Sequence, residues 1–270
     1  MTMALRKDRF QLPCGELPLV SIITAVLNSH DKIDQVIDEV NRQTYPRKEL
    51  IIIDGGSTDG TVEILKRKSG NIAFWLSEED GGIYDAFNKG IDAAKGDWIF
   101  FLGADDAFPR KDVLENVLTR SISDETILLV GNILYANGLL FRGRFDRSLY
   151  VRNTIHHQGV FYRRRVFESY RYGLLPSGKY RRFQLSGDYA LNLKLFCEQA
   201  KCLYIDEIIA RCGRGISMEG RWRGYSEEIF IRRQYLGYSS LLLDIVTLLR
   251  FGRRRFCYLM KNLFDRRKTR

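Results

Sequence analysis

The sequence predicts an α/β fold in which a mostly parallel, buried sheet is flanked by helices. In the first half of the chain, short runs of β-branched and aliphatic residues alternate with segments whose apolar residues recur at helical spacing. The connections between them are short, and a glycine-rich or acidic turn follows two of the apolar runs. Strands and helices in alternation are typical of parallel sheets that are covered on both faces.

Each predicted element depends on its own pattern. Strands are expected at residues 19–25, 50–53, 72–76 and 98–102, all of them nearly continuous apolar runs. Helices follow the first three strands: one over residues 33–40 with Ser29 as its N-cap, one from Thr61, and one over residues 83–94 that ends at Gly96. The second half is less regular, with strands expected at residues 127–130, 139–145 and 160–162 and a helix that begins at Asp188.

The positive charge of the chain is concentrated at one end. The 270 residues are 45% hydrophobic and carry a net charge of +10, and this length is enough for one large domain with a sizeable core. Residues 1–210 hold 28 Lys/Arg and 28 Asp/Glu, whereas residues 211–270 hold 15 Lys/Arg and 5 Asp/Glu. The surplus therefore belongs to the C-terminal segment, which argues against a nucleic-acid-binding protein.

Residues 238–264 combine apolar and basic side chains. The apolar run over residues 241–251 is interrupted by Asp244 and is about half the ~20 residues that a membrane-spanning helix requires. Three arginines follow it at residues 253–255, before a second cluster in which basic and apolar residues are mixed. This pattern predicts amphipathic helices in the interface of an anionic membrane. A helical hairpin that packs on the body, with its charged face in water, is the alternative.

The cysteines and the N-terminus favour a cytoplasmic location. The five cysteines form no C-x-x-C pair, so neither a disulfide framework nor a structural zinc site is expected. Residues 1–16 contain several charged side chains, and no apolar stretch of the length of a secretory signal follows them.

Two acidic turns lie where strands are expected to end. Ligands of parallel sheets bind beyond the carboxyl ends of the strands, so both turns are candidate sites. Asp105 and Asp106 follow the fourth strand and offer ligands for a divalent metal that would neutralise a nucleotide diphosphate, although such a pair also serves as a turn or helix cap. Asp54 opens the turn at residues 54–60 and offers hydrogen bonds to a base or ribose, whereas Asp59 is expected to cap the next helix.

Four segments of the chain resemble family 2 glycosyltransferases in their order and separation. They are residues 20–28 (VSIITAVLN), 51–61 (IIIDGGSTDGT), 77–90 (SEEDGGIYDAFNKG) and 101–106 (FLGADD). The resemblance extends over residues 18–220 and is greatest to the bacterial branch that acts in exopolysaccharide, colanic-acid-like and lipopolysaccharide assembly. It implies a GT-A, Rossmann-like fold and a nucleotide-sugar donor.

The resemblance implies roles for residues on the donor side. Asp54 would contact the nucleoside, and the family often has a second acid beside it where this chain has Gly55. Asp80, Asp85 and Asn88 would line the donor site.

The resemblance also implies a metal site. The family's motif is commonly acid–any–acid, and Gly103 replaces the first acid here. Asp105 is left as the expected ligand, with Asp106 as its helper, for Mn²⁺ or Mg²⁺.

Asp188 is the candidate catalytic base, because the family's base is usually an acid that opens a helix downstream. Inverting transfer needs a carboxylate that takes the proton of the acceptor hydroxyl. An acid near a helix N-terminus that interacts with the helix dipole is the alternative. Similar enzymes carry a His-Gln pair at the place of His157 and Gln158, which would line the acceptor or phosphate pocket; a structural role is the alternative.

These observations predict an inverting glycosyltransferase that uses a UDP- or GDP-sugar and a polyprenyl-linked or saccharide acceptor in bacterial surface polysaccharide synthesis. A sugar-phosphate nucleotidyltransferase is one alternative, although residues 24–29 (TAVLNS) lack the basic, glycine-rich loop of that class. A non-catalytic nucleotide-sugar-binding protein is the other. We expect the enzyme at the inner face of the cytoplasmic membrane, held there peripherally.

The expected division of the chain has three parts. An N-terminal extension covers residues 1–17, and the glycosyltransferase domain covers residues 18–220. This domain comprises a nucleotide-sugar-binding half (18–110) and an acceptor and catalytic half (111–220), and a basic amphipathic helical tail follows at residues 221–270.

Overall fold

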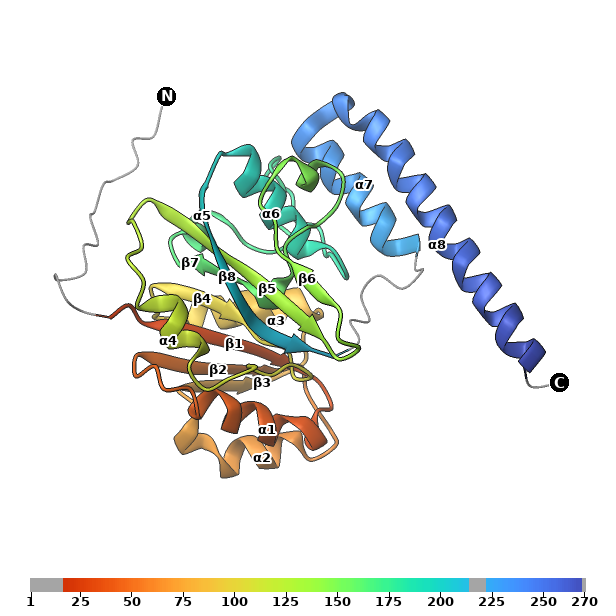
Figure 1. Ribbon diagram of the computed structural model, residues 1–270. Helices are drawn as coiled ribbons and strands as arrows, with labels where there is room; N and C mark the ends of the chain where they lie inside the picture. Colours follow the sequence, from red (N-terminus) through yellow and green to blue (C-terminus); the bar gives the residue numbers. More distant parts are fainter. Residues whose placement is uncertain (1–16, 214–221, 269–270) are drawn as a thin grey trace.

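The computed structural model describes residues 17–213 and 222–268, without the side chains of residues 238–239 and 257–268 (Figure 1). The predicted N-terminal extension therefore lies, apart from Leu17, outside the described residues. The strands are β1 (Val20–Val26), β2 (Lys48–Asp54), β3 (Phe74–Ser77), β4 (Trp98–Phe101), β5 (Thr126–Tyr135), β6 (Leu140–Arg142), β7 (Val160–Arg163) and β8 (Lys201–Cys212). The α-helices are α1 (His30–Asn41), α2 (Thr61–Arg67), α3 (Ile83–Ala93), α4 (Val113–Leu118), α5 (Val166–Ser169), α6 (Gly187–Cys197), α7 (Trp222–Leu236) and α8 (Leu241–Lys268), and short 3-10 turns are η1 (Ser69–Asn71), η2 (Arg147–Tyr150), η3 (His157–Gly159) and η4 (Gly237–Ser240).

One mixed sheet of eight strands forms the centre of the molecule. Its order is β3–β2–β1–β4–β7–β5–β6, and β8 pairs with β5. Strands β3, β2, β1 and β4 are parallel, whereas β7 is antiparallel to both of its neighbours. The register places Val26, Asp54 and Ser77 side by side, so the first three parallel strands end together at one edge. The predicted α/β fold with a mostly parallel sheet and flanking helices is confirmed.

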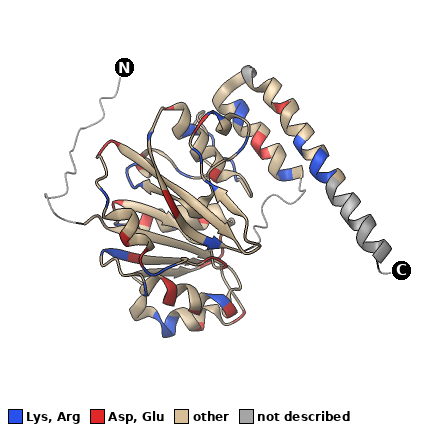
Figure 2. Ribbon diagram, in the orientation of Figure 1, with Lys and Arg blue, Asp and Glu red and all other residues tan. Residues whose placement is uncertain are grey.

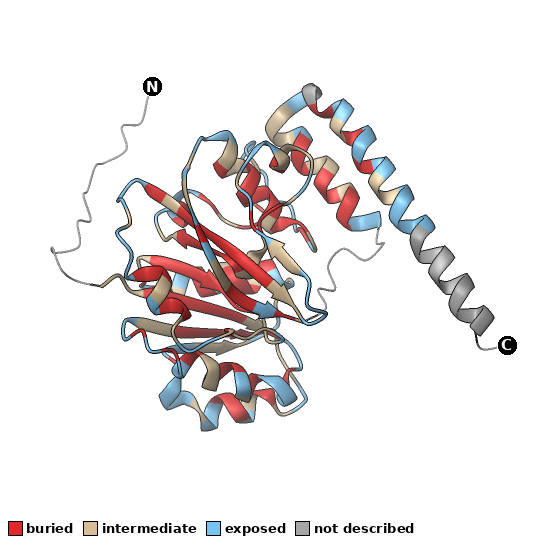
Figure 3. Cartoon of the chain, in the orientation of Figure 1, coloured by how far each residue is buried: buried red, intermediate tan, exposed pale blue. Residues whose placement is uncertain are grey.

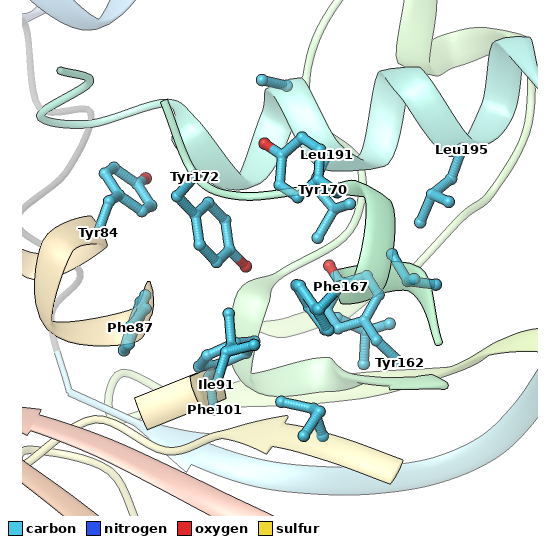
Figure 4. Close-up of a cluster of buried hydrophobic side chains, with 14 of the residues drawn as sticks. Tyr84, Phe87, Ile91, Phe101, Tyr162, Phe167, Tyr170, Tyr172, Leu191 and Leu195 are labelled. Carbon is cyan, nitrogen blue, oxygen red and sulfur yellow. The ribbon is translucent and has the colours of Figure 1, made fainter. Parts of the chain in front are cut away.

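Both faces of the sheet are buried, which explains the continuous apolar runs of its strands (Figure 3). Neighbouring residues of β1 point to opposite faces: Ile22 packs in the core that includes α1, α2 and α4, and Ile23 in the core that includes α3 and α6. Each fully buried Ile contributes about 1.5–3 kcal/mol relative to an exposed one. The second core is rich in aromatic rings (Figure 4).

Several local features differ from the prediction. Ser29 stands at the N-cap position of α1, but its side chain makes no capping hydrogen bond. The strand predicted over residues 139–145 is shorter, and β8 and α4 were not predicted at all. In β8 the charged pair Asp206 and Glu207 interrupts the apolar pattern, and its pairing with β5 contains register shifts.

The C-terminal extension is helical, as predicted, and its two helices have different surroundings. Helix α7 packs against α6, whereas α8 is one continuous helix that projects beyond the body (Figure 1). The fully buried Arg232 of α7 joins them, because it donates to Asp244 Oδ1 (3.2 Å) and Thr247 Oγ1 (2.6 Å) of α8. Arg250 of α8 donates in return to Glu228 of α7 (3.1 Å).

Candidate active site

Asp54 closes β2 and is fully buried. Its carboxylate accepts hydrogen bonds from the backbone of Gly56 (3.2 Å) and Ser57 (2.9 Å) and from the Ser77 hydroxyl at the end of β3 (2.7 Å). The Ser57 hydroxyl donates to it as well. Because these donors occupy both oxygens, Asp54 holds the glycine-rich loop in place, and a direct contact with the nucleoside stays a prediction.

Asp59, in the same loop, connects two helix starts. It accepts hydrogen bonds from the backbone of Thr61 at the start of α2 (3.0 Å) and of His30 at the start of α1 (3.0 Å). The predicted capping role of Asp59 is therefore confirmed.

Asp80 and Asp85 fix the loop between β3 and α3. Asp80 accepts a hydrogen bond from the backbone of Gly82 (2.7 Å), and Asp85 accepts one from Gly81 (2.9 Å). The carboxylate of Asp80 lies against Gly55, where a Cβ would be 2.9 Å from its Oδ2. The space beside Asp54 that often holds a second acid is thus filled by Asp80.

Tyr172 binds two of the predicted site residues. Asn88 exchanges two hydrogen bonds with the Tyr172 backbone, at 3.0 Å and 2.9 Å, so its amide links α3 to the loop before α6. His157 Nε2 lies 3.0 Å from the Tyr172 hydroxyl, and its ring stacks on Phe101. Burial lowers the pKa of His157 to about 3, so the ring is neutral at physiological pH. Both residues therefore contact the aromatic core through Tyr172, which Figure 4 labels together with Phe101. A contact of His157 with the acceptor stays a prediction.

The loop after β4 places its two acids in different settings. Asp106 accepts hydrogen bonds from the backbone of Gly103 (3.1 Å) and from the Gln158 amide (2.8 Å), and burial raises its pKa. A Cβ at Gly103 would overlap the Asp106 carboxylate, so any side chain at position 103 would require this carboxylate to move. Asp105 is exposed and forms an ion pair with Lys32 of α1.

Asp105 and Asp106 suit a metal ion for which the protein supplies only some of the ligands. Asp105 already binds a cationic group, and its oxygens face water. Among the described residues, no three His, Cys, Asp or Glu side chains gather into a cage for a metal ion. A metal on Asp105 would complete its coordination with phosphate oxygens and water, which is usual for Mg²⁺ at phosphate sites.

Asp188 lies at the start of α6, where four polar residues determine its environment. Its Oδ1 accepts a hydrogen bond from the Tyr84 hydroxyl of α3 (3.2 Å), and its Oδ2 accepts one from the Asn153 amide (2.8 Å). Asn153 is oriented by the Asn192 amide (3.1 Å), which in turn accepts a hydrogen bond from the Tyr162 hydroxyl (2.7 Å). Burial raises the pKa of Asp188 to about 6, although the hydrogen bonds from Tyr84 and Asn153 and the nearby backbone N–H groups oppose this rise.

Sequence reasoning did not single out Tyr84 or Asn153. Tyr84 lies within the segment at residues 77–90 that carries the resemblance, and this was the one available signal. Asn153 lies in an irregular segment between η2 and η3, where no periodic pattern marks a residue.

The chain has clear relatives among known proteins. It matches the family model for glycosyl transferase family 2 over residues 21–185. A PGL/p-HBAD biosynthesis glycosyltransferase of Mycobacterium bovis is 36% identical over 191 residues, which are 68% of this chain and 72% of that protein. Among solved structures, S. aureus TarS 1-349 in complex with UDP-GlcNAc has a TM-score of 0.62 at 18% identity, over 89% of this chain and 73% of that one.

A second solved structure, mannosyltransferase PcManGT from Pyrobaculum calidifontis in complex with GDP-Man and Mn²⁺, has a TM-score of 0.56 at 19% identity, over 87% of this chain and 65% of that one. At these identities, the structural likeness shows the GT-A fold. The match to the family model covers more than half of the chain and decides between the enzyme classes that the sequence left open. The chain therefore belongs to glycosyl transferase family 2 and is a glycosyltransferase.

Proposed function

We propose that the enzyme transfers a sugar from a UDP- or GDP-sugar to a saccharide acceptor on a lipid carrier, with inversion at the anomeric carbon and with Asp188 as the general base. The observation that carries this proposal is the setting of Asp188. Its carboxylate is held at both oxygens, and burial raises its pKa to about 6. A base is most effective when its pKa lies near the working pH.

In the proposed step, Asp188 accepts the proton of an acceptor hydroxyl while that oxygen forms a bond to the anomeric carbon. The bond from this carbon to the diphosphate oxygen breaks, and its electron pair leaves with the nucleoside diphosphate. Attack from the face opposite the diphosphate inverts the configuration. The hydrogen bonds from Tyr84 and Asn153 keep the carboxylate in a single orientation before the acceptor arrives.

We place a divalent metal, Mn²⁺ or Mg²⁺, on Asp105, with Asp106 as support. Such a metal supplies positive charge that stabilises the departing diphosphate. The exposure of Asp105 supports this placement, as does the Mn²⁺ bound to the mannosyltransferase with the similar fold; the Lys32 ammonium that pairs with Asp105 would have to give way to the metal. Asp106 fixes the loop through the Gly103 backbone and the Gln158 amide.

We further propose that α8 lies on the inner face of the cytoplasmic membrane. No helix in residues 17–213 or 222–268 is long and apolar enough to cross a bilayer. Helix α8 nevertheless exposes a face of large apolar side chains, and its buried side chains Asp244 and Thr247 contact α7 instead (Figure 3). The exposed face consists of Leu241, Leu242, Ile245, Val246, Leu248, Leu249 and Phe256.

Charge complementarity selects an anionic lipid surface as the partner of this face. Residues 253–255 are three exposed arginines that directly follow the apolar stretch (Figure 2). Each basic residue near such a surface contributes about 1 kcal/mol. A lipid-linked acceptor would be found at the same surface, which is why we assign the enzyme to the synthesis of bacterial surface polysaccharide. The boundary at residue 220 between the glycosyltransferase domain and the basic helical tail also remains a proposal.

The test is a donor panel in which release of nucleoside diphosphate is measured for UDP- and GDP-sugars, with Mn²⁺, with Mg²⁺ and with EDTA. Each donor is offered with a polyprenyl-linked saccharide, with the free saccharide and with no acceptor. We expect acceptor-dependent release that needs the metal and is faster with the lipid-linked saccharide. The configuration of the new bond is read from the NMR coupling constant of its anomeric proton, and retention would overturn the proposed mechanism.

A further inference from the structure

Glu227 of α7 binds the segment that carries the candidate base. Its carboxylate is buried and accepts hydrogen bonds from three consecutive backbone N–H groups: those of Gln184 (3.0 Å), Leu185 (3.0 Å) and Ser186 (2.9 Å). The Ser186 hydroxyl also lies 3.4 Å from the Gly224 carbonyl oxygen of α7. Helix α6 begins at the next residue, and Asp188 follows one residue later.

The position of Glu227 beside the start of α6 explains why a charged carboxylate can be buried there. The three N–H groups that it binds lie at residues 184–186, up to the N-cap of α6, and the positive end of the helix dipole favours an anion there. Ser186 stands at the N-cap of α6 and makes no side-chain capping bond. Within the part of the chain that the structure describes, Glu227 forms no ion pair with a Lys or Arg, so the backbone donors alone compensate its burial.

We propose that Glu227 is a positioning residue that fixes Asp188 in its reactive place. This inference rests on the proposed role of Asp188 as the base. Only Gly187 lies between Ser186 and Asp188, so a shift of the segment moves the carboxylate away from the acceptor hydroxyl. Misplacement by about 1 Å costs on the order of 10²-fold in rate. The match to the family model ends at residue 185, so both Asp188 and Glu227 lie outside it.

The next residue of α7 provides a matched control. Glu228 is buried like Glu227, but its partners are Arg250 (3.1 Å) and Arg232 (3.9 Å) in the contact between α7 and α8. Glu227→Gln and Glu228→Gln therefore remove the same charge from adjacent positions of one helix. Both are expected to lower the melting temperature, whereas only Glu227→Gln is expected to lower kcat.

The experiment measures kcat and the Kd for the nucleoside diphosphate in the full-length enzyme. We expect Glu227→Gln to lower kcat about 10–100-fold with an unchanged Kd, because the hydrogen bonds that Glu227 accepts come from residues 184–186 and not from the donor loops. If this variant does not fold, Glu227→Asp takes its place, since it keeps the charge and draws the carboxylate back by one methylene; a smaller loss of kcat is then expected. Wild-type kcat in the folded variant, or an equal loss in Glu228→Gln, would overturn the inference.

A double-mutant cycle separates this inference from the proposed function. If Glu227 acts through Asp188, then Glu227→Gln should have no further effect on kcat in the Asp188→Asn background. Additive losses would show that Glu227 acts in another way while Asp188 remains the base. Unchanged kcat in Asp188→Asn alone would instead refute the proposed function.

Discussion

Replacing Asp188 by Asn tests both the proposed base and the cost of burying its charge. The Asn side chain retains the shape of Asp and remains neutral at every pH. Its oxygen still accepts from the Asn153 amide, and its NH₂ group donates to the Tyr84 oxygen, because a tyrosine hydroxyl also accepts hydrogen bonds. The variant is therefore expected to fold with the same contacts.

The expected change in stability follows from the pKa. A rise of the pKa of Asp188 from 3.8 to about 6 corresponds to about 3 kcal/mol of lost stability once the group is ionised. A raised carboxyl pKa favours the protonated folded state, so the loss is absent below pH 4, grows between pH 4 and 6, and is complete above pH 6. The Asn variant should thus be more stable than the wild type by up to about 3 kcal/mol at pH 8, and by less at pH 5.

Two assays check this reasoning on the same protein. Urea unfolding at pH 8 and pH 5 gives the free energies of unfolding, and steady-state kinetics give kcat. Removal of a general base is expected to lower kcat by about 10²–10⁴-fold while nucleotide affinity stays near that of the wild type. A variant that is less stable at pH 8 would refute the argument from burial, and an equal loss of nucleotide affinity would place Asp188 in the donor site.

Three further outcomes are expected. Asp105→Asn should nearly abolish transfer without loss of the fold, because this exposed side chain pairs with Lys32 at the surface; full wild-type activity in excess EDTA would contradict the metal assignment. The wild-type kcat/KM should fall about tenfold per pH unit below about pH 6, as Asp188 becomes protonated, and a profile that is flat down to pH 5 would exclude it as the base. The double variant Leu242→Glu/Leu249→Glu should release the enzyme from anionic liposomes in a flotation assay. The control Leu139→Glu, which changes an exposed leucine of the body, should not. Liposome binding that survives the double substitution would show that the apolar face of α8 is not the contact.

The sequence predicted the strands that are buried on both faces and the acidic residues at their ends. Strands buried on both faces give continuous apolar runs, so the parallel half of the sheet could be predicted from its own residues. Asp54 and Asp105 became candidates because acids that follow such runs are expected at one edge of the sheet, where Asp54 lies. Asp188 became a candidate through the family resemblance, since one acid at the start of a helix has no pattern of its own.

The partners of these residues could not be predicted for a physical reason. Asn153 acts through a hydrogen bond across 35 residues and Glu227 through three that span 41–43 residues, and such contacts produce no periodicity. Strand β8 was not predicted because it contains two adjacent charged residues, Asp206 and Glu207. The folded sheet accommodates them at its edge, where Asp206 accepts a hydrogen bond from Asn132 (3.1 Å) and Glu207 forms an ion pair with Arg110 (3.1 Å). In the sequence, these two charges interrupt the apolar pattern, so the edge strand resembles a loop.

Because β5 pairs with β8, the unit that folds extends beyond the segment that matches the family model. The match to the family model ends at residue 185, yet β8 follows it and pairs with β5 from Thr126 to Tyr135. A fragment that ended there would expose the unpaired N–H and C=O groups of a long central strand, and it would lack Ile205 and Ile209, which complete the core around Leu129. The cooperative folding unit thus reaches at least to Cys212, and a shorter fragment would form aggregates by edge-to-edge pairing.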